Sequence, residues 1–186
     1  MALTSSLTSG QRAQRKLLVT AAAWGTPDQT TGERPNKQIL GARTEDSSIE
    51  FNPDINTTTD IRGNTYTDVE KTEPQQTLDP SYILGGSGLH DYLTEAVLKN
   101  DIDAYNQRFD IYVITVWLVN GTPVTTSGSE DGKFYTVKHK NCSIFPTSIG
   151  GSTYVSMPLE VHFSNDIVEG TVDKIADDFE FSKASA

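Results

Sequence analysis

TTTDIRGNTYTDVEKTEPQQT, residues 57–77, predicts a β-hairpin with very little apolar surface. Seven of its 21 residues are Thr, and the large apolar residues are Ile61, Tyr66 and Val69. β-Branched Thr suits a pleated strand, and Gly63-Asn64 fits the two-residue loop of a type II′ turn. Because an isolated hairpin is only marginally stable in water, we expect this one to pair with other copies or to line a wet surface. That favours an assembly protein over a monomeric enzyme.

A loop at Gly63-Asn64 would place Ile61 opposite Tyr66, and cross-strand partners share a side. One predicted face is almost wholly polar and contains Asn56, Thr58, Asp60, Arg62, Thr65, Thr67, Val69 and Lys71. The other face is apolar mainly at the Ile61–Tyr66 tip, so we expect the tip to dock on something.

The rest of the 186-residue chain predicts one β-rich domain. We expect a mobile N-terminal arm over 1–14, a single domain over 15–175 and an acidic tail over 176–186. Gly25 to Asn36 is rich in residues that break secondary structure and predicts an exposed loop. Alternation and turn residues predict strands over 16–22, 37–43, 48–52, 55–62, 64–71, 133–145, 152–163 and 167–175.

Two segments stand out from this pattern. Arg108–Val119 is the most apolar run and predicts a strand buried on both sides. Residues 89–99 predict a helix, with Ser87 as a plausible N-cap. The apolar stripe of that helix is Leu89, Tyr92, Leu93, Ala96 and Val97.

Charge and composition narrow the classes of function. The net charge is −10, and tight binding to duplex DNA relies on Lys and Arg, so a nucleic-acid binder is not expected. An acidic surface would instead keep a polyanion from adhering. No apolar run approaches the roughly 20 residues of a membrane span. Cys142 is the single cysteine, so no internal disulfide is possible.

Residues that could carry chemistry form no recognisable site. His90, His139 and His162 lie in separate elements and match no metal-ligand spacing. Cys142 is expected to be a small buried hydrophobe, although a Cys–His nucleophile remains open. Asp60, Asp68, Glu70 and Glu73 could be paired as acid and base only on paper. We therefore predict no catalytic residue, no metal ligand and no cofactor.

Residues 49–80, IEFNPDINTTTDIRGNTYTDVEKTEPQQTLDP, together with FDIYVITVWL at 109–118, resemble the major tail tube proteins of long-tailed bacteriophages and related prophages. YVSMPLEVHFSNDIVEGTVD at 154–173 is similar to their closing strands. The resemblance covers about residues 37–175. It implies a mainly β fold, an antiparallel β-sandwich or split barrel of tail-tube type with one short flanking α-helix.

The resemblance also implies a structural virion protein that forms stacked hexameric rings. The resulting tube would surround a tape-measure protein, conduct phage DNA without binding it specifically, and end on tail terminator and baseplate or tip proteins. Such a protein is located in the virion tail, after assembly in the host cytoplasm. Candidate lumen-facing residues are Asn56, Thr58, Asp60, Arg62, Thr65, Thr67 and Lys71. Candidate inter-subunit contacts are Ile61, Tyr66, Pro27, Arg34, Arg12 and Arg15.

Three other hypotheses remain open, and one of them is a tube for a contractile, bacteriocin-like particle. A monomeric carbohydrate-binding β-sandwich of a virion or cell surface would need a flat aromatic platform, for which Tyr82, Tyr105 and Tyr135 are candidates. A hydrolase that uses acidic pairs ranks last.

Overall fold

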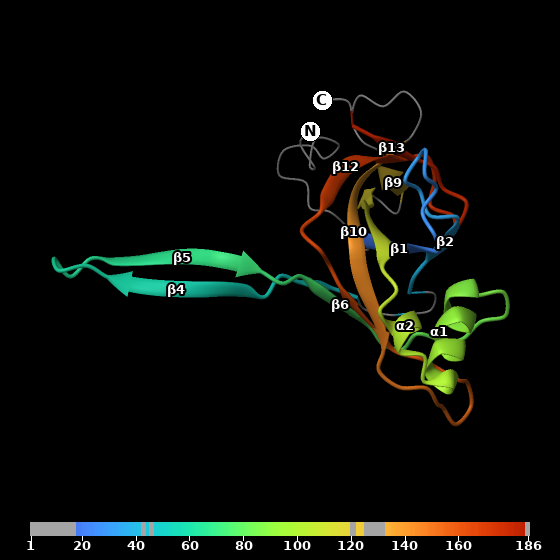
Figure 1. The fold of residues 1–186 in the computed structure, drawn as a ribbon. Coiled ribbons are helices and arrows are strands. Elements are labelled where there is room, and N and C mark those ends of the chain that lie inside the picture. The colour runs from blue at the N-terminus through green and yellow to red at the C-terminus, as the bar shows by residue number, and fades with distance from the viewer. Residues whose placement is uncertain (1–17, 42–43, 45–46, 120–121, 125–132, 185–186) are drawn as a thin grey trace.

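The computed structural model describes residues 18–41, 44, 47–119, 122–124 and 133–184. The predicted N-terminal arm (1–14), with Arg12, lies outside the described residues, and so does Arg15. Within them the fold is mainly β and antiparallel, as predicted from the sequence (Figure 1).

The centre of the fold is strand β7 (Phe109–Thr115), which lies between β1 (Leu18–Trp24) and β10 (Phe134–Pro146). β1 pairs on its other edge with β2 (Asn36–Ile39). The first half of β10 also pairs with β12 (Ile167–Val172), and β12 pairs with β13 (Phe181–Lys183).

Strand β10 belongs to two sheets because it bends near its middle. Its pairing with β7 shifts between His139 and Cys142, and Asn141 between them has a φ of 57°. Beyond that bulge β10 pairs with β11 (Leu159–His162), β11 with β6 (Gln75–Leu78), and β6 with β3 (Ile49–Glu50). Two sheets that share one bent strand form the predicted split barrel.

The core lies on both sides of β1 and β7, which confirms burial on both sides for residues 109–115 of the apolar run. The single strand expected over 108–119 is not observed, because β7 ends at Thr115 and Trp117–Val119 forms a strand of a separate ribbon. Phe109 and Ile111 face one buried cluster, which also contains Leu78, Leu159 and the helix residue Leu93. The alternate residues of β7 face a second cluster, which contains Tyr112, Ile114, Val172 and Phe179.

The predicted helix is α1 (Gly88–Lys99), which buries Leu89, His90, Leu93 and Ala96. Ser87 occupies the N-cap position but makes no side-chain cap hydrogen bond. The helix ends at Asn100, whose left-handed φ of 50° fits a helix C-terminus. A second, four-residue helix, α2 (Ile102–Tyr105), was not predicted; the Asp101 carboxylate accepts hydrogen bonds from its first amides.

Two predicted segments differ from the structure. The strand expected over 152–163 is confined to β11, because 147–158 forms a loop tied back by isolated bridges. The chain end expected as a separate tail packs on the barrel instead. Phe179 is buried against Tyr112, with ring centroids 4.9 Å apart, and Asp177 accepts a hydrogen bond of 2.7 Å from the Ile39 amide.

Two small ribbons lie apart from this path. One consists of β8 (Trp117–Val119) and β9 (Thr122–Val124). The other consists of β4 (Pro53–Thr59) and β5 (Thr65–Thr72) and is the hairpin of the opening sequence. It extends away from the barrel as a long projection (Figure 1).

Candidate assembly surface

The hairpin β4–β5 is detached from the core. Its strands pair with each other and with no other described strand, and every residue of both strands is exposed. It joins the body through Asn52 and Glu73, whose backbones are linked by a hydrogen bond of 3.4 Å. Among the described residues the hairpin therefore has no apolar support from its own copy, and no described strand pairs with either of its edges.

The register of the hairpin corrects the predicted one. Thr59 pairs with Thr65, Thr58 with Tyr66 and Ile55 with Val69, so the pairing is displaced by three positions. Asp60 to Asn64 forms the turn, in which the Gly63 amide donates to the Asp60 carbonyl at 3.0 Å. Gly63 has a φ of 81°, as expected for the left-handed residue that follows a type I turn in a longer hairpin loop.

The Asp60 carboxylate determines this longer loop. Its Oδ1 accepts hydrogen bonds from the Arg62 amide at 2.8 Å and from the Asn64 amide at 2.9 Å. Its Oδ2 accepts from the Asn64 side chain at 3.1 Å and from the Tyr66 hydroxyl at 3.3 Å. The Asn64 amide, the Asn64 side chain and the Arg62 amide together lower the pKa of Asp60. The tip is thus ordered by local hydrogen bonds, with the Ile61 side chain fully exposed at 105%.

When the register of a hairpin shifts by an odd number of positions, residues of the two strands that were expected on the same face lie on opposite faces. The predicted lumen-facing set therefore does not lie on one side: Thr65 and Thr67 lie opposite Thr59 and Thr57, while Asn56 and Thr58 lie on the other side. Asp60 and Arg62 belong to the turn. Ile61 and Tyr66 are likewise not cross-strand partners.

The observed register separates the hairpin by charge. The face that we call the neutral face is uncharged and consists of Ile55, Thr57, Thr59, Thr65, Thr67 and Val69. The opposite side, the acidic face, consists of Asp54, Asn56, Thr58, Tyr66, Asp68, Glu70 and Lys71. Glu70 is the unpaired residue at a bulge, and its carboxylate accepts a hydrogen bond of 3.0 Å from Asn56.

The loop over 25–36 is only partly the exposed contact loop that we predicted. Pro27 is exposed and available for contact. Arg34 is not, because the residue is only 6% exposed. Its guanidinium donates to Asp110 at 3.1 Å and to the Gly25 carbonyl at 2.7 Å. The prediction of Arg34 as a surface contact is therefore corrected to a structural role.

Arg34 is part of an ionic network under this loop. Lys138, 3% exposed, contacts Glu33 at 2.9 Å and Asp110 at 3.1 Å. Glu33 also accepts a hydrogen bond of 2.8 Å from the Tyr112 hydroxyl. Partial burial would raise the pKa of Glu33, but the hydrogen bonds from Lys138 and Tyr112 outweigh it and lower the pKa. The network fastens the loop to the central strands.

Histidines and the cysteine have structural partners. His90 is buried between the hydroxyls of Ser81 (2.9 Å from Nε2) and Ser87 (2.5 Å from Nδ1), and burial lowers its pKa. Cys142 is buried, and desolvation raises its pKa to about 11, which disfavours the thiolate that a nucleophile needs. His139 Nδ1 lies 2.9 Å from the Ser164 carbonyl.

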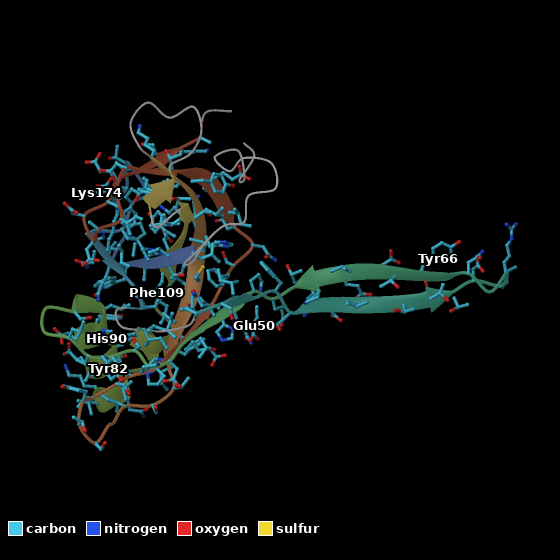
Figure 2. All side chains as sticks on the ribbon, turned by 180° about the vertical axis from the view of Figure 1, so that it is seen from behind. Glu50, Tyr66, Tyr82, His90, Phe109 and Lys174 are labelled. Carbon is cyan, nitrogen blue, oxygen red and sulfur yellow. The ribbon has the colours of Figure 1, made fainter. Side chains whose placement is uncertain are left out.

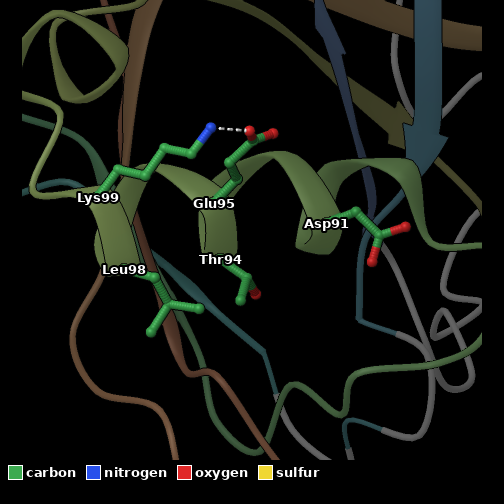
Figure 3. A pocket seen from close by; sticks show the side chains of 5 residues that line it. All are labelled: Asp91, Thr94, Glu95, Leu98 and Lys99. Carbon is green, nitrogen blue, oxygen red and sulfur yellow. Dashed lines mark hydrogen bonds and ion pairs between the residues drawn. The ribbon is translucent and has the colours of Figure 1, made fainter.

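Other site hypotheses gain little from the geometry. In the part of the chain that the structure describes, no three His, Cys, Asp or Glu side chains are grouped to hold a metal ion. A shallow hollow on α1 is lined by that helix alone and is spanned by the Glu95–Lys99 ion pair (Figure 3). Tyr82 meets Tyr154 edge to face, whereas Tyr135 lies on β10 beside β12. Tyr82 and Tyr135 therefore do not form one flat platform. No described helix is long and apolar enough to cross a membrane.

Comparisons with known proteins give remote likenesses. No protein-family model matches the sequence, and no curated protein does. A chain of the PVC sheath–tube complex of an extracellular contractile injection system, in the extended state, is 13% identical, with a TM-score of 0.45 over 91% of this chain and 98% of that one. A chain of the anti-feeding prophage cap, the tube-terminating cap, is 15% identical, with a TM-score of 0.40 over 99% of this chain and 100% of that one.

Proposed function

We propose that the protein is a structural subunit, without catalytic activity, of a tube resembling the tail of a long-tailed bacteriophage. The observation that carries the proposal is the detached hairpin, which is exposed at every strand residue and free at both edges. An exposed ribbon with free edges is a template for pairing with another chain. Pairing around a closed ring removes those edges.

In this proposal six copies form a ring and the rings stack into a tube. Residues 1–14, which include Arg12, together with Arg15 and the exposed Pro27, contribute contacts between copies. The tube surrounds a tape-measure protein, ends on terminator and baseplate or tip proteins, and belongs to the virion tail after assembly in the host cytoplasm. The acidic face of the hairpin suits a lumen for DNA, because its three carboxylates, of Asp54, Asp68 and Glu70, outnumber its one cation, Lys71, and repel phosphates.

The test is assembly of the purified protein over a range of concentration. Light scattering coupled to size-exclusion chromatography should show species larger than the monomer, and negative-stain images should show rings or tubes. A variant in which Gly-Ser-Gly replaces residues 53–72 should remain monomeric with an unchanged circular dichroism spectrum from the body. A wild-type protein that stays strictly monomeric at high concentration, with neither rings nor tubes, would refute the proposal.

A further inference from the structure

The body has an uncharged surface of its own. It is formed by two loops, residues 80–88 and 147–156. Between Asp79 and Asp91 there is no Asp, Glu, Lys or Arg, and the one histidine, His90, is buried. No charged residue stands between Lys140 and Glu160. In a chain with 22% charged residues and a net charge of −10, such a surface is distinctive.

Backbone hydrogen bonds hold the two loops side by side. The Ile83 amide donates to the Val155 carbonyl at 3.0 Å, and the Met157 amide donates to the Ser81 carbonyl at 2.7 Å. Gly150 and Ser156 exchange two backbone bonds, of 3.1 and 2.8 Å. The surface is therefore formed before any partner arrives, and a preformed surface loses less entropy on binding.

Apolar side chains project from these loops into solvent. Tyr154 is 67% exposed and rests edge to face on Tyr82, with ring centroids 6.3 Å apart. We call this the aromatic loop surface; its members are Tyr82, Leu84, Ile149, Tyr154 and Val155. Exposed tyrosine beside aliphatic side chains is typical of the centre of a protein interface.

The hairpin and the aromatic loop surface lie at opposite ends of the molecule. In Figure 2, Tyr66 lies far out on the hairpin, whereas Tyr82 lies on the body at the side away from it. The seven residues of β4 extend roughly 23 Å at about 3.3 Å per residue. The hairpin points away from the aromatic loop surface of its own copy, so it can reach only that of another copy.

Charge selects the side of the hairpin that would make this contact. Two copies that each carry a net charge of −10 repel one another, and contact between two uncharged surfaces adds least to that repulsion. The acidic face would also have to lose the water around its carboxylates, which is costly because the aromatic loop surface provides no cation to pair with them. The neutral face avoids both penalties, and its threonine methyl groups can pack on tyrosine rings.

We propose that the neutral face of one copy docks on the aromatic loop surface of a second copy. This inference rests on the proposed function, in that it names the surfaces through which the copies assemble. Because the two surfaces differ and lie at opposite ends, the contact is head-to-tail. Repetition of a head-to-tail contact gives a closed ring or an open filament.

The first test introduces a carboxylate on each surface, with matched controls. Thr57→Glu charges the neutral face, whereas Thr58→Glu adds the same charge one residue away on the acidic face. Tyr154→Glu charges the aromatic loop surface, whereas Leu98→Glu charges an exposed apolar position of α1. We expect Thr57→Glu and Tyr154→Glu to raise the concentration needed for assembly by about tenfold or more, because an unpaired carboxylate resists burial. The two controls should assemble close to the wild type.

The second test is a disulfide between copies. A Thr57→Cys protein mixed with a Tyr154→Cys protein should give a cross-linked dimer on a non-reducing gel, and Thr58→Cys in place of Thr57→Cys should give much less. Cys142 is buried and its thiol is poorly ionised, so it contributes little background. If the wild type assembles but both glutamate variants match their controls and no cross-link forms, this inference is overturned while the proposed function stands. A wild type that never assembles overturns both.

Discussion

Removal of the Asp110 carboxylate should destabilise the monomer more than removal of any surface ion pair. Asp110 is 4% exposed and contacts Arg34 and Lys138, each at 3.1 Å. In Asp110→Ala the side chains of Arg34 and Lys138 remain almost buried but lose this carboxylate. The Glu33 carboxylate is then the one negative charge left in the network, and it also pairs with Lys37. Breaking a buried ion pair in this way costs about 3–5 kcal/mol, because an uncompensated charge stays in the interior.

For a domain of this size, 1 kcal/mol shifts the melting temperature by about 2–4 °C, so Asp110→Ala should lower the melting temperature by on the order of 10 °C. The matched control is Asp178→Ala, which removes an exposed pair with Lys174 of 2.6 Å and should change the stability little, because solvent screens an exposed ion pair. Asp110→Asn, which keeps the shape but loses the charge, should fall between the two.

Urea unfolding followed by circular dichroism measures these differences, at a concentration where chromatography shows a monomer, because assembly would add its own stability. If Asp110→Ala unfolds within about 1 kcal/mol of the wild type, the network does not hold the 25–36 loop on the barrel and our account of Arg34 is wrong.

Three further outcomes are expected. Burial lowers the pKa of His90, so below the ordinary histidine pKa of 6.5 the unfolded chain binds more protons than the folded one. The free energy of unfolding should therefore decline as the pH falls through 6.5 towards the folded pKa. Urea titrations at pH 7.5 and 5 should show this decline in the wild type and not in His90→Gln. Asp60→Ala should speed hydrogen exchange at the Arg62 and Asn64 amides without changing the melting temperature of the body; unchanged exchange would show that the carboxylate does not order the tip. Gly170→Ala places a Cβ 2.3 Å from the Ser182 carbonyl, so β13 should detach and the chain end become sensitive to trypsin; a variant as resistant as the wild type would contradict this packing.

The central architecture could be predicted because its signals are local. The alternation and length of the apolar segments predicted the buried strand over 109–115 and the buried side of α1, and the predicted bounds of β10 are within one residue of the observed ones. The register of the hairpin was not predicted, because Gly63-Asn64 was interpreted as a complete two-residue loop. The better signal for the turn was a type I pattern, which favours Asp at the first position and Gly at the fourth. Asp60 and Gly63 match that pattern.

The roles of Glu33 and Arg34 were inaccessible to local patterns. Asp110 follows Arg34 by 76 positions, and Lys138 follows Glu33 by 105 positions. The composition of the loop, rich in Gly, Pro and Thr, does not indicate that two of its charged side chains turn inward and contact the central strands. The same holds for Phe179, since a short acidic segment has no periodicity that would place one of its side chains in the core.

Because the hairpin is separate from the barrel, substitutions in it can alter assembly without altering folding. The barrel buries side chains on both faces of its central strands, so its folding depends on residues such as Phe109 and Tyr112 and not on the hairpin. The hairpin has only its Asp60 turn and its cross-strand threonine pairs, which leave an isolated ribbon marginally stable. Substitutions on the neutral face should therefore alter the free energy of assembly while leaving that of folding almost unchanged. If Thr57→Glu lowered the melting temperature of the monomer as much as it impaired assembly, the two functions would not be separable and the hairpin would have to contact the barrel.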